Sequence, residues 1–149
     1  MYCIKQGRTL CSDVLRTYSA KIHDSCRRSL SNGDKISFQR EVTDKNVDEF
    51  IKLTGDDNPV HVDNPRYCHG ALLIGFVSSV IGTKLPGPGT VLVHQNVKFP
   101  NPCYVNQTLT ITVEVVDIRK LVTCKFYIYS HLNKVNVLEG EARLVVKNK

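Results

Sequence analysis

The sequence predicts an α+β fold in which an antiparallel sheet wraps around one central apolar helix. Two observations lead to this prediction: residues 70–83 are apolar on nearly every side, and the chain after them changes to an alternating apolar pattern. About five strands are expected, most of them after the helix. An antiparallel sheet has one face to cover, and a helix packed against that face covers it. The length of 149 residues suits one domain with a substantial core.

Two elements are expected before the central helix. Residues 36–42 alternate well enough for a strand, and residues 43–55 are typical of a short helix. Thr43 can cap that helix and Gly55 can terminate it. The helix dipole favours acidic side chains in the first turns, and this segment has three there: Asp44, Asp48 and Glu49. One buried face is predicted from the spacing of Val47, Phe50, Ile51 and Thr54.

The central helix is expected to end at the Pro-Gly-rich residues 85–89, after which strands follow. Four sets of alternating apolar residues each share one face of a strand. These sets are Val91, Val93, Val97 and Phe99; Leu109, Ile111, Val113 and Val115; Val122, Cys124, Phe126 and Ile128; and Ala142, Leu144 and Val146. The connections at 117–120 and 131–134 are short enough for antiparallel hairpins.

Most of the positive charge lies near the N-terminus. Residues 1–33 contain six basic and two acidic side chains, a net charge of +4. The rest of the chain contains 14 basic and 12 acidic ones, so it contributes only +2 to the total net charge of +6. A basic, Ser-bearing, acid-poor leader has the composition of an organellar transit peptide, and a disordered basic tail is the alternative. We therefore expect a leader over residues 1–33 and one folded domain over residues 34–149.

Composition argues against several other classes of protein. Nucleic-acid binding is not expected, because the positive charge lies in the leader rather than on the folded domain. No membrane span is expected either, since the longest apolar run, ALLIGFVSSVIG, is too short to cross a bilayer. The six cysteines form no CxxC pair, which favours free thiols in a reducing compartment. His61, Asp63 and His69 could be imagined as metal ligands, but the sequence supplies no ordered scaffold for them, and no metal is expected.

The segment GDDNPVH, residues 55–61, brings an acid and a base close together after the first helix. Pro59 fixes a backbone angle and Asn58 favours a turn, so Asp56 and His61 are expected on a rigid loop. A carboxylate and an imidazole at this spacing can share general acid–base work, such as adding water to an activated double bond or removing it. The alternative is a capping Asp and an exposed, inert His.

The same segment resembles the signature of the hydratase-2 family, the MaoC-like (R)-specific enoyl-thioester hydratases. Residues that match defined positions of that signature are Phe50, Leu53, Thr54, Gly55, Asp56, Asn58, Pro59, Val60 and His61. The likeness continues in HGALLIGFVSS, LPGPG and VKFPNPCYV, and covers residues 35–147. Within the family the chain is most similar to mitochondrial hydroxyacyl-thioester dehydratases of fatty acid synthesis.

This resemblance implies a hot-dog fold and a hydro-lyase activity. The implied reaction is reversible dehydration of (3R)-hydroxyacyl thioesters, carried by acyl carrier protein or CoA, to trans-2-enoyl thioesters in the mitochondrial matrix. Asp56 and His61 match the catalytic pair, and the Gly70 N–H matches the donor to the thioester carbonyl. Ser78 and Asn58 match supporting positions near the substrate. The resemblance implies no metal, nucleotide or flavin cofactor and a homodimer.

The chain departs from the family pattern after His61. Family members have a longer connection to the His-Gly pair, whereas here only VDNPRYC joins His61 to His69, and Tyr67 stands where Ala or Ser is usual. Seven extended residues span about 23–25 Å, so the fold can still close. Two alternatives therefore stay open: an enoyl-CoA hydratase of β-oxidation, and a catalytically impaired protein that binds acyl thioesters.

Overall fold

A computed structural model of the chain describes residues 29–146. Residues 1–28, which hold most of the predicted leader, and residues 147–149 lie outside the described residues. The elements follow one another as β1 (Lys35–Val42), α2 (Asp44–Thr54), α3 (Pro59–Val62), α4 (Gly70–Thr83), β2 (Thr90–Lys98), β3 (Gln107–Ile118), β4 (Val122–Ser130) and β5 (Val135–Val146). Within the described part, none of the helices combines the length and the apolar character that crossing a membrane requires.

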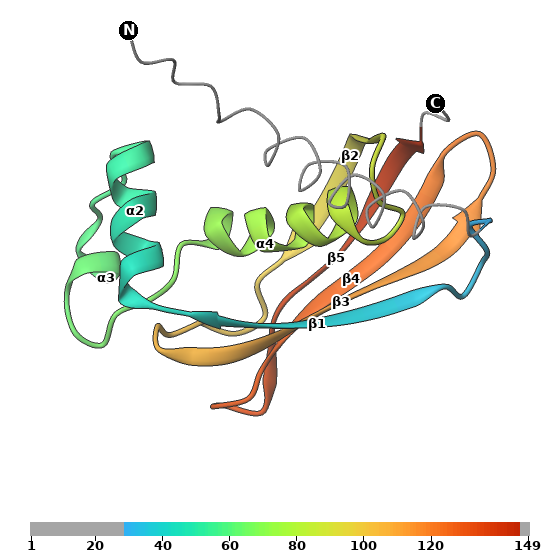
Figure 1. Cartoon of the computed structure of the whole chain (residues 1–149). Helices are drawn as coiled ribbons and strands as arrows, with labels where there is room; N and C mark the ends of the chain where they lie inside the picture. Colours follow the sequence, from blue (N-terminus) through green and yellow to red (C-terminus); the bar gives the residue numbers. More distant parts are fainter. Residues whose placement is uncertain (1–28, 147–149) are drawn as a thin grey trace, which may run out of the picture.

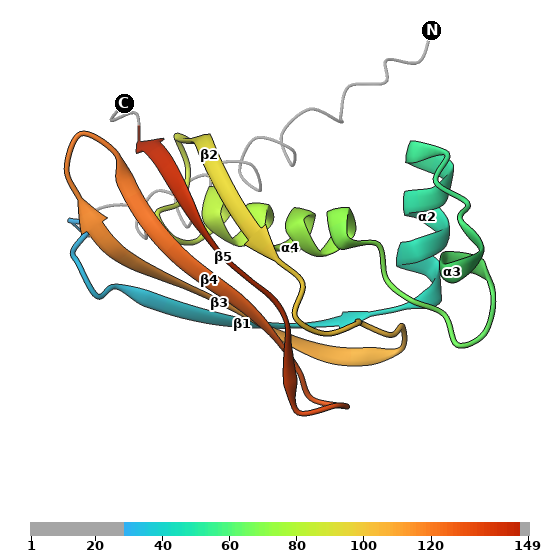
Figure 2. The ribbon, with the colours of Figure 1, turned by 180° about the vertical axis from the view of Figure 1, so that it is seen from behind.

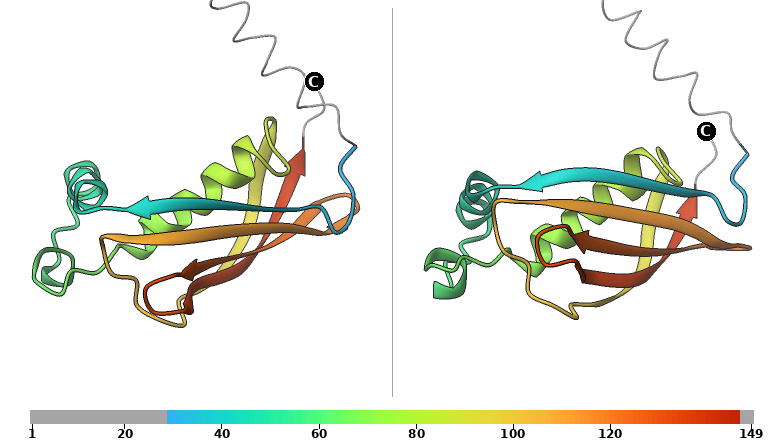
Figure 3. Two further views of the ribbon diagram at one scale, coloured as in Figure 1. Left: turned by 60° about the horizontal axis from the view of Figure 1, so that its bottom comes forward. Right: turned by 90° about the horizontal axis from the view of Figure 1, so that it is seen from below.

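The strands form one antiparallel sheet in the order β1-β3-β4-β5-β2. The sheet curves, and α4 lies along its concave face (Figure 1, Figure 3). Hairpins join β3 to β4 and β4 to β5, as the short connections predicted, while β2 reaches the far edge beside β5. The predicted α+β arrangement, with a sheet wrapped around a central helix, is confirmed.

The core lies between α4 and the inner face of the sheet. Five apolar side chains of α4 are buried: Leu73, Phe76, Val77, Val80 and Ile81. The alternating residues predicted for two of the strands are buried opposite them, namely Leu109, Ile111, Val113, Val115, Val122, Cys124, Phe126 and Ile128. The helix is less enclosed than expected, since its outer side is exposed at small residues, Ala71, Gly75, Ser78 and Ser79.

The capping residues predicted for α2 delimit it as expected. The Thr43 side chain accepts a hydrogen bond from the Asn46 N–H, and the Asn46 side chain accepts one from the Thr43 N–H. Gly55 ends the helix with a φ of 76°, a left-handed conformation that suits glycine. The predicted buried face is shorter than expected: Val47 is buried, but Thr54 is exposed and donates to the Phe50 carbonyl.

Strand β2 does not follow the simple alternation predicted for it. The register shifts between Leu92 and His94, so Val91 and Val97 lie on opposite sides of the shift. Val97 pairs with Gly140 and packs partly against the core, whereas Val91 and Val93 are 46% and 56% exposed. The prediction that Val91, Val93, Val97 and Phe99 share one face is therefore wrong, because one extra residue in a strand reverses the orientation of those that follow.

Candidate active site

The GDDNPVH segment lies between α2 and α4, at the end of the molecule that projects beyond the sheet (Figure 1, Figure 2). The sequence predicted a loop here, but Pro59–Val62 form the one-turn helix α3. Asn58 caps this turn, since its side-chain oxygen accepts from the Val60 N–H at 3.4 Å, and Pro59 occupies the first helical position. Asn58 therefore orders the backbone that carries His61.

One ring nitrogen of His61 is held by the backbone. Nδ1 lies 2.9 Å from the Tyr67 carbonyl oxygen, and a carbonyl can only accept, so Nδ1 carries the proton. The lone pair of the neutral ring is then on Nε2, which bonds to no group within residues 29–146. An imidazole oriented through one nitrogen and free at the other is prepared to act as a general base.

The Asp56 carboxylate is 52% exposed and lies close to the imidazoles. The ligand atoms of Asp56, His61 and His69 are all within 4.8 Å of one another. Within its own loop, Asp56 receives a long hydrogen bond of 3.5 Å from the Asn58 N–H, and its own N–H donates to Thr54. The structure thus brings the predicted acid and base together.

His69 adjoins both members of this pair, and sequence reasoning gave it no role. The side chain is 2% exposed, and its ring stacks on the ring of His61 with the centroids 3.6 Å apart. Its Nε2 lies 3.0 Å from the Asp56 carbonyl oxygen and 3.8 Å from the Asp56 carboxylate. His69 occupies the N-cap position of α4, but its side chain makes no capping bond; its contacts are with residues farther back in the chain, which the local sequence does not specify.

The geometry of the two imidazole rings in this cluster does not suit a metal ion. His61 uses Nδ1 and His69 uses Nε2 in bonds to backbone carbonyl groups. The two rings are stacked with an interplanar angle of 26°, so their in-plane lone pairs do not converge as ligands around one ion do. Asp63, considered with the two histidines in the sequence, is not part of the cluster. Acid–base chemistry suits this arrangement better than metal binding.

The N-terminus of α4 begins directly after His69. Gly70 is its first residue, no side chain caps it, and its first N–H groups have no acceptor in the described part of the chain. These groups and the helix dipole can stabilise negative charge that develops on an oxygen. Ser78 lies eight residues farther along, about 12 Å at the usual helical rise, and is exposed. The chain therefore does not bring Ser78 to Asp56 and His61.

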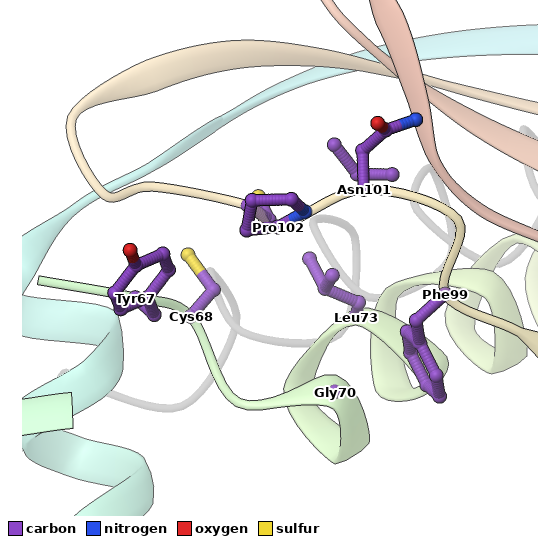
Figure 4. A pocket seen from close by; sticks show the side chains of 9 residues that line it. Tyr67, Cys68, Gly70, Leu73, Phe99, Asn101 and Pro102 are labelled. Atoms are coloured by element: carbon purple, nitrogen blue, oxygen red, sulfur yellow. The ribbon is translucent and has the colours of Figure 1, made fainter. Parts of the chain in front are cut away.

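A small cavity of about 270 Å³ opens beside Gly70 (Figure 4). Its lining includes the apolar side chains of Leu73, Phe99 and Val137, together with Cys68 and Cys103. Asp56 and His61 do not line this cavity, whereas Gly70 at the start of α4 does. A Cβ on Gly70 would come within 2.9 Å of the Phe99 ring, which shows how closely this ring covers the helix end.

The buried thiols of Cys68 and Cys124 are unsuited to nucleophilic chemistry. Cys68, Cys103 and Cys124 are buried and free of disulfides. A hydrogen bond with the Cys103 thiol, together with burial, raises the pKa of Cys68, and burial raises the pKa of Cys124 to about 11. Both therefore stay protonated near neutral pH, where the thiolate would be needed.

The short connection after α3 is anchored by Arg66. Its guanidinium bonds to Asp44 at 3.0 Å and to Asp48 at 2.6 Å, and its Nε donates to the His61 carbonyl. Tyr67 then pairs with Tyr104 in an isolated antiparallel bridge. The short segment is thus tied to α2 on one side and to the chain before β3 on the other. The Arg66 side chain is only 15% exposed, and its guanidinium is used in these internal bonds.

This anchor predicts a dependence of stability on pH. The Asn106 amide, followed by Arg66, holds the pKa of Asp44 below its ordinary value of 3.8. A group with a depressed folded-state pKa stabilises the fold above its unfolded pKa, and this contribution is lost as the pH falls through the folded value. Chemical unfolding at about pH 6 and about pH 3 should show a smaller loss of stability in Asp44→Asn than in the parent chain. Equal losses in the two proteins would contradict the role of this carboxylate.

Comparisons with known proteins agree with these features. A family model described as MaoC like domain matches residues 30–134. An (R)-specific enoyl-CoA hydratase of Rhodospirillum rubrum is 35% identical, over 78% of this chain and 88% of the relative. A mitochondrial 3-hydroxyacyl-[acyl-carrier-protein] dehydratase of Arabidopsis thaliana is 24% identical, over 91% and 87%. The structure of the unliganded R-hydratase PhaJ1 from Pseudomonas aeruginosa matches this one with a TM-score of 0.75 at 27% identity, over 80% of this chain and 84% of that one. The predicted hot-dog fold is therefore confirmed.

Proposed function

Because the chain belongs to the family of MaoC-like hydratases, we propose that it catalyses reversible dehydration of (3R)-hydroxyacyl thioesters to trans-2-enoyl thioesters. The observation that carries this proposal is the His61 imidazole, oriented through Nδ1 by the Tyr67 carbonyl and close to the Asp56 carboxylate. Both lie near a helix N-terminus with unpaired N–H groups. The names of two relatives, a hydratase and a dehydratase of acyl thioesters, support the same reaction class.

In the hydration direction, water lies between the Asp56 carboxylate and the His61 imidazole. His61 Nε2 accepts a proton from this water as the water oxygen bonds to carbon 3 of the enoyl thioester. The electrons of the double bond move toward the thioester carbonyl, and the developing oxyanion accepts hydrogen bonds from the N-terminus of α4 at Gly70. The imidazolium, stabilised by Asp56, returns the proton to carbon 2. Dehydration follows the same steps in reverse.

We assign the substrate to the acyl-carrier class and the protein to mitochondrial fatty acid synthesis on two grounds. The leader has the composition of a transit peptide, and the Arabidopsis relative is by name a mitochondrial dehydratase of carrier-bound substrates. The apolar cavity beside Gly70 offers room for part of the acyl chain. A comparison of kcat/KM for carrier-protein and CoA thioesters of the same acyl group separates this assignment from a hydratase of β-oxidation.

We also propose that the active form is a homodimer. The edge strand β2 has no partner on its outer side within the described chain, and it exposes Val91, Leu92 and Val93 by about half. The exposed side of α4 carries the small residues Ala71, Gly75, Ser78 and Ser79, which would let a second copy approach closely. An unpaired strand edge with exposed apolar side chains favours pairing with a second copy.

The reaction itself is tested by following the loss of a short trans-2-enoyl-CoA on addition of the purified full chain. We expect turnover in the usual range for enzymes, about 1–10³ per second, and a 3-hydroxyacyl product of R configuration by chiral analysis. A folded protein that gives no product above the enzyme-free rate, or that gives the S product, would overturn the proposed function. Retained binding of the thioester without turnover would then favour the acyl-thioester-binding alternative.

A further inference from the structure

His69 is the buried side chain that touches both members of the proposed acid–base pair. Its ring lies against the ring of His61, and against Phe50 with centroids 4.8 Å apart. Its Nε2 is 3.0 Å from the carbonyl oxygen of Asp56. Residues 52–60 around Asp56 are all exposed, so this bond is the contact that joins the Asp56 backbone to a buried group.

The hydrogen-bond partners of the ring define its tautomer. A carbonyl oxygen accepts only, so Nε2 of His69 carries the proton. Nδ1 is buried and has no hydrogen-bond partner among the described residues. A buried polar atom without a partner is unfavourable, and an apolar ring of similar size would avoid that penalty. The bond that Nε2 donates therefore gives the clearest physical reason for an imidazole at this position.

We infer that His69 is a positioning residue for the reaction, an inference that rests on the proposed function. Its Nε2–H donates to the backbone carbonyl of Asp56 and so fixes the backbone that carries the Asp56 carboxylate. The face of its ring packs against the ring of His61. The other bonds made by Asp56, at 3.3 and 3.5 Å, reach only the exposed residues Thr54 and Asn58 and do not fix Asp56 to the core. The backbone of His69 leads directly into Gly70, so one residue links the acid–base pair to the helix N-terminus.

Two substitutions separate the hydrogen bond from the stacking. His69→Gln retains an N–H near the position of Nε2, whereas His69→Phe retains a flat ring but no donor. We expect His69→Phe to lower kcat for enoyl-CoA hydration by roughly 10- to 100-fold with KM changed less than about two-fold, because a misplacement of about 1 Å costs about 10²-fold in rate. His69→Gln should lose less kcat than His69→Phe, with a logarithm of the loss that is at most half as large. Circular dichroism and urea unfolding of each variant report whether the fold is retained.

Several outcomes would overturn the inference. Full activity of a folded His69→Phe, or equal losses in His69→Phe and His69→Gln, would leave the hydrogen bond without a role in positioning. A second measurement does not depend on turnover: ¹⁵N NMR of the imidazole groups should show His69 with its proton on Nε2, and the ¹³C shift of the Asp56 carbonyl should change in His69→Phe but little in His69→Gln. A proton on Nδ1 would contradict the inference directly. If these NMR signatures are found and the parent chain has no activity, the proposed function fails while the contact stands.

Discussion

Replacement of His61 by Ala is expected to abolish most of the hydration activity while leaving the fold intact. The neutral ring presents its lone pair at Nε2, and loss of a positioned general base typically lowers kcat by about 10²–10⁴-fold. His61 lies on the one-turn helix α3 and is only partly buried, so its truncation should change stability little. Steady-state kinetics with a trans-2-enoyl-CoA measure the loss, with KM expected to change much less than kcat.

Asp56→Asn should lose activity on the same scale, because the amide cannot stabilise the imidazolium that forms in the reaction. Asp57→Asn is the matched control, since Asp57 is the neighbouring exposed carboxylate and does not belong to the cluster formed by Asp56, His61 and His69. The double variant of Asp56 and His61 should be little worse than either single one, as residues that act together show non-additive losses. Similar rates for Asp56→Asn and Asp57→Asn would remove the acid–base pair from the mechanism.

Gly140→Val is expected to produce the largest loss of stability. Gly140 lies in β5 between β4 and the edge strand β2, paired with Phe126 on one side and Val97 on the other. A Cβ at this position would overlap the backbone oxygen of Asn96 and lie 2.8 Å from the Phe126 ring. The backbone of β2 must then move away from β5, at a cost of about 1–3 kcal/mol in the free energy of unfolding.

Urea unfolding followed by circular dichroism measures this effect. Gly82→Ala is the control for a glycine-to-larger change, because nothing lies within 4 Å of a Cβ at Gly82 in helix α4. Alanine is favoured over glycine in a helix by up to about 1 kcal/mol, so this variant should be as stable as the parent or slightly more so. An unchanged unfolding midpoint for Gly140→Val would show that β2 does not need its close approach to β5.

Local signals in the sequence were sufficient for most of the fold. Thr43 and Gly55 define the ends of α2 because capping bonds are made by neighbouring residues, and these were correctly predicted. The alternation in β3 and β4 correctly identified the buried side chains because both strands lie inside the sheet with one face on the core. For β2 the same rule failed, since a register shift and an edge position depend on partners that the local sequence does not specify.

The candidate site was predictable in part for the same reason. Asp56 and His61 are five residues apart, so a turn and a cap suffice to bring them together, and the sequence pattern indicates both. His69 was missed because its contacts depend on how the seven-residue connection folds back onto α2. The ion pairs of Arg66 were not predictable from local sequence either, because its acidic partners lie 18 and 22 positions earlier in the chain.

The projecting position of α2 and α3 has a consequence for dynamics. Val47 is the buried residue of α2, no residue of α3 is buried, and residues 52–60 are exposed throughout. A segment with so little buried surface opens at a lower free energy than a cooperative sheet, so its amide hydrogens should exchange through local unfolding. Heat or denaturant would then remove the acid–base pair before the sheet melts, and a bound substrate that engages it would shift this opening equilibrium toward the ordered form.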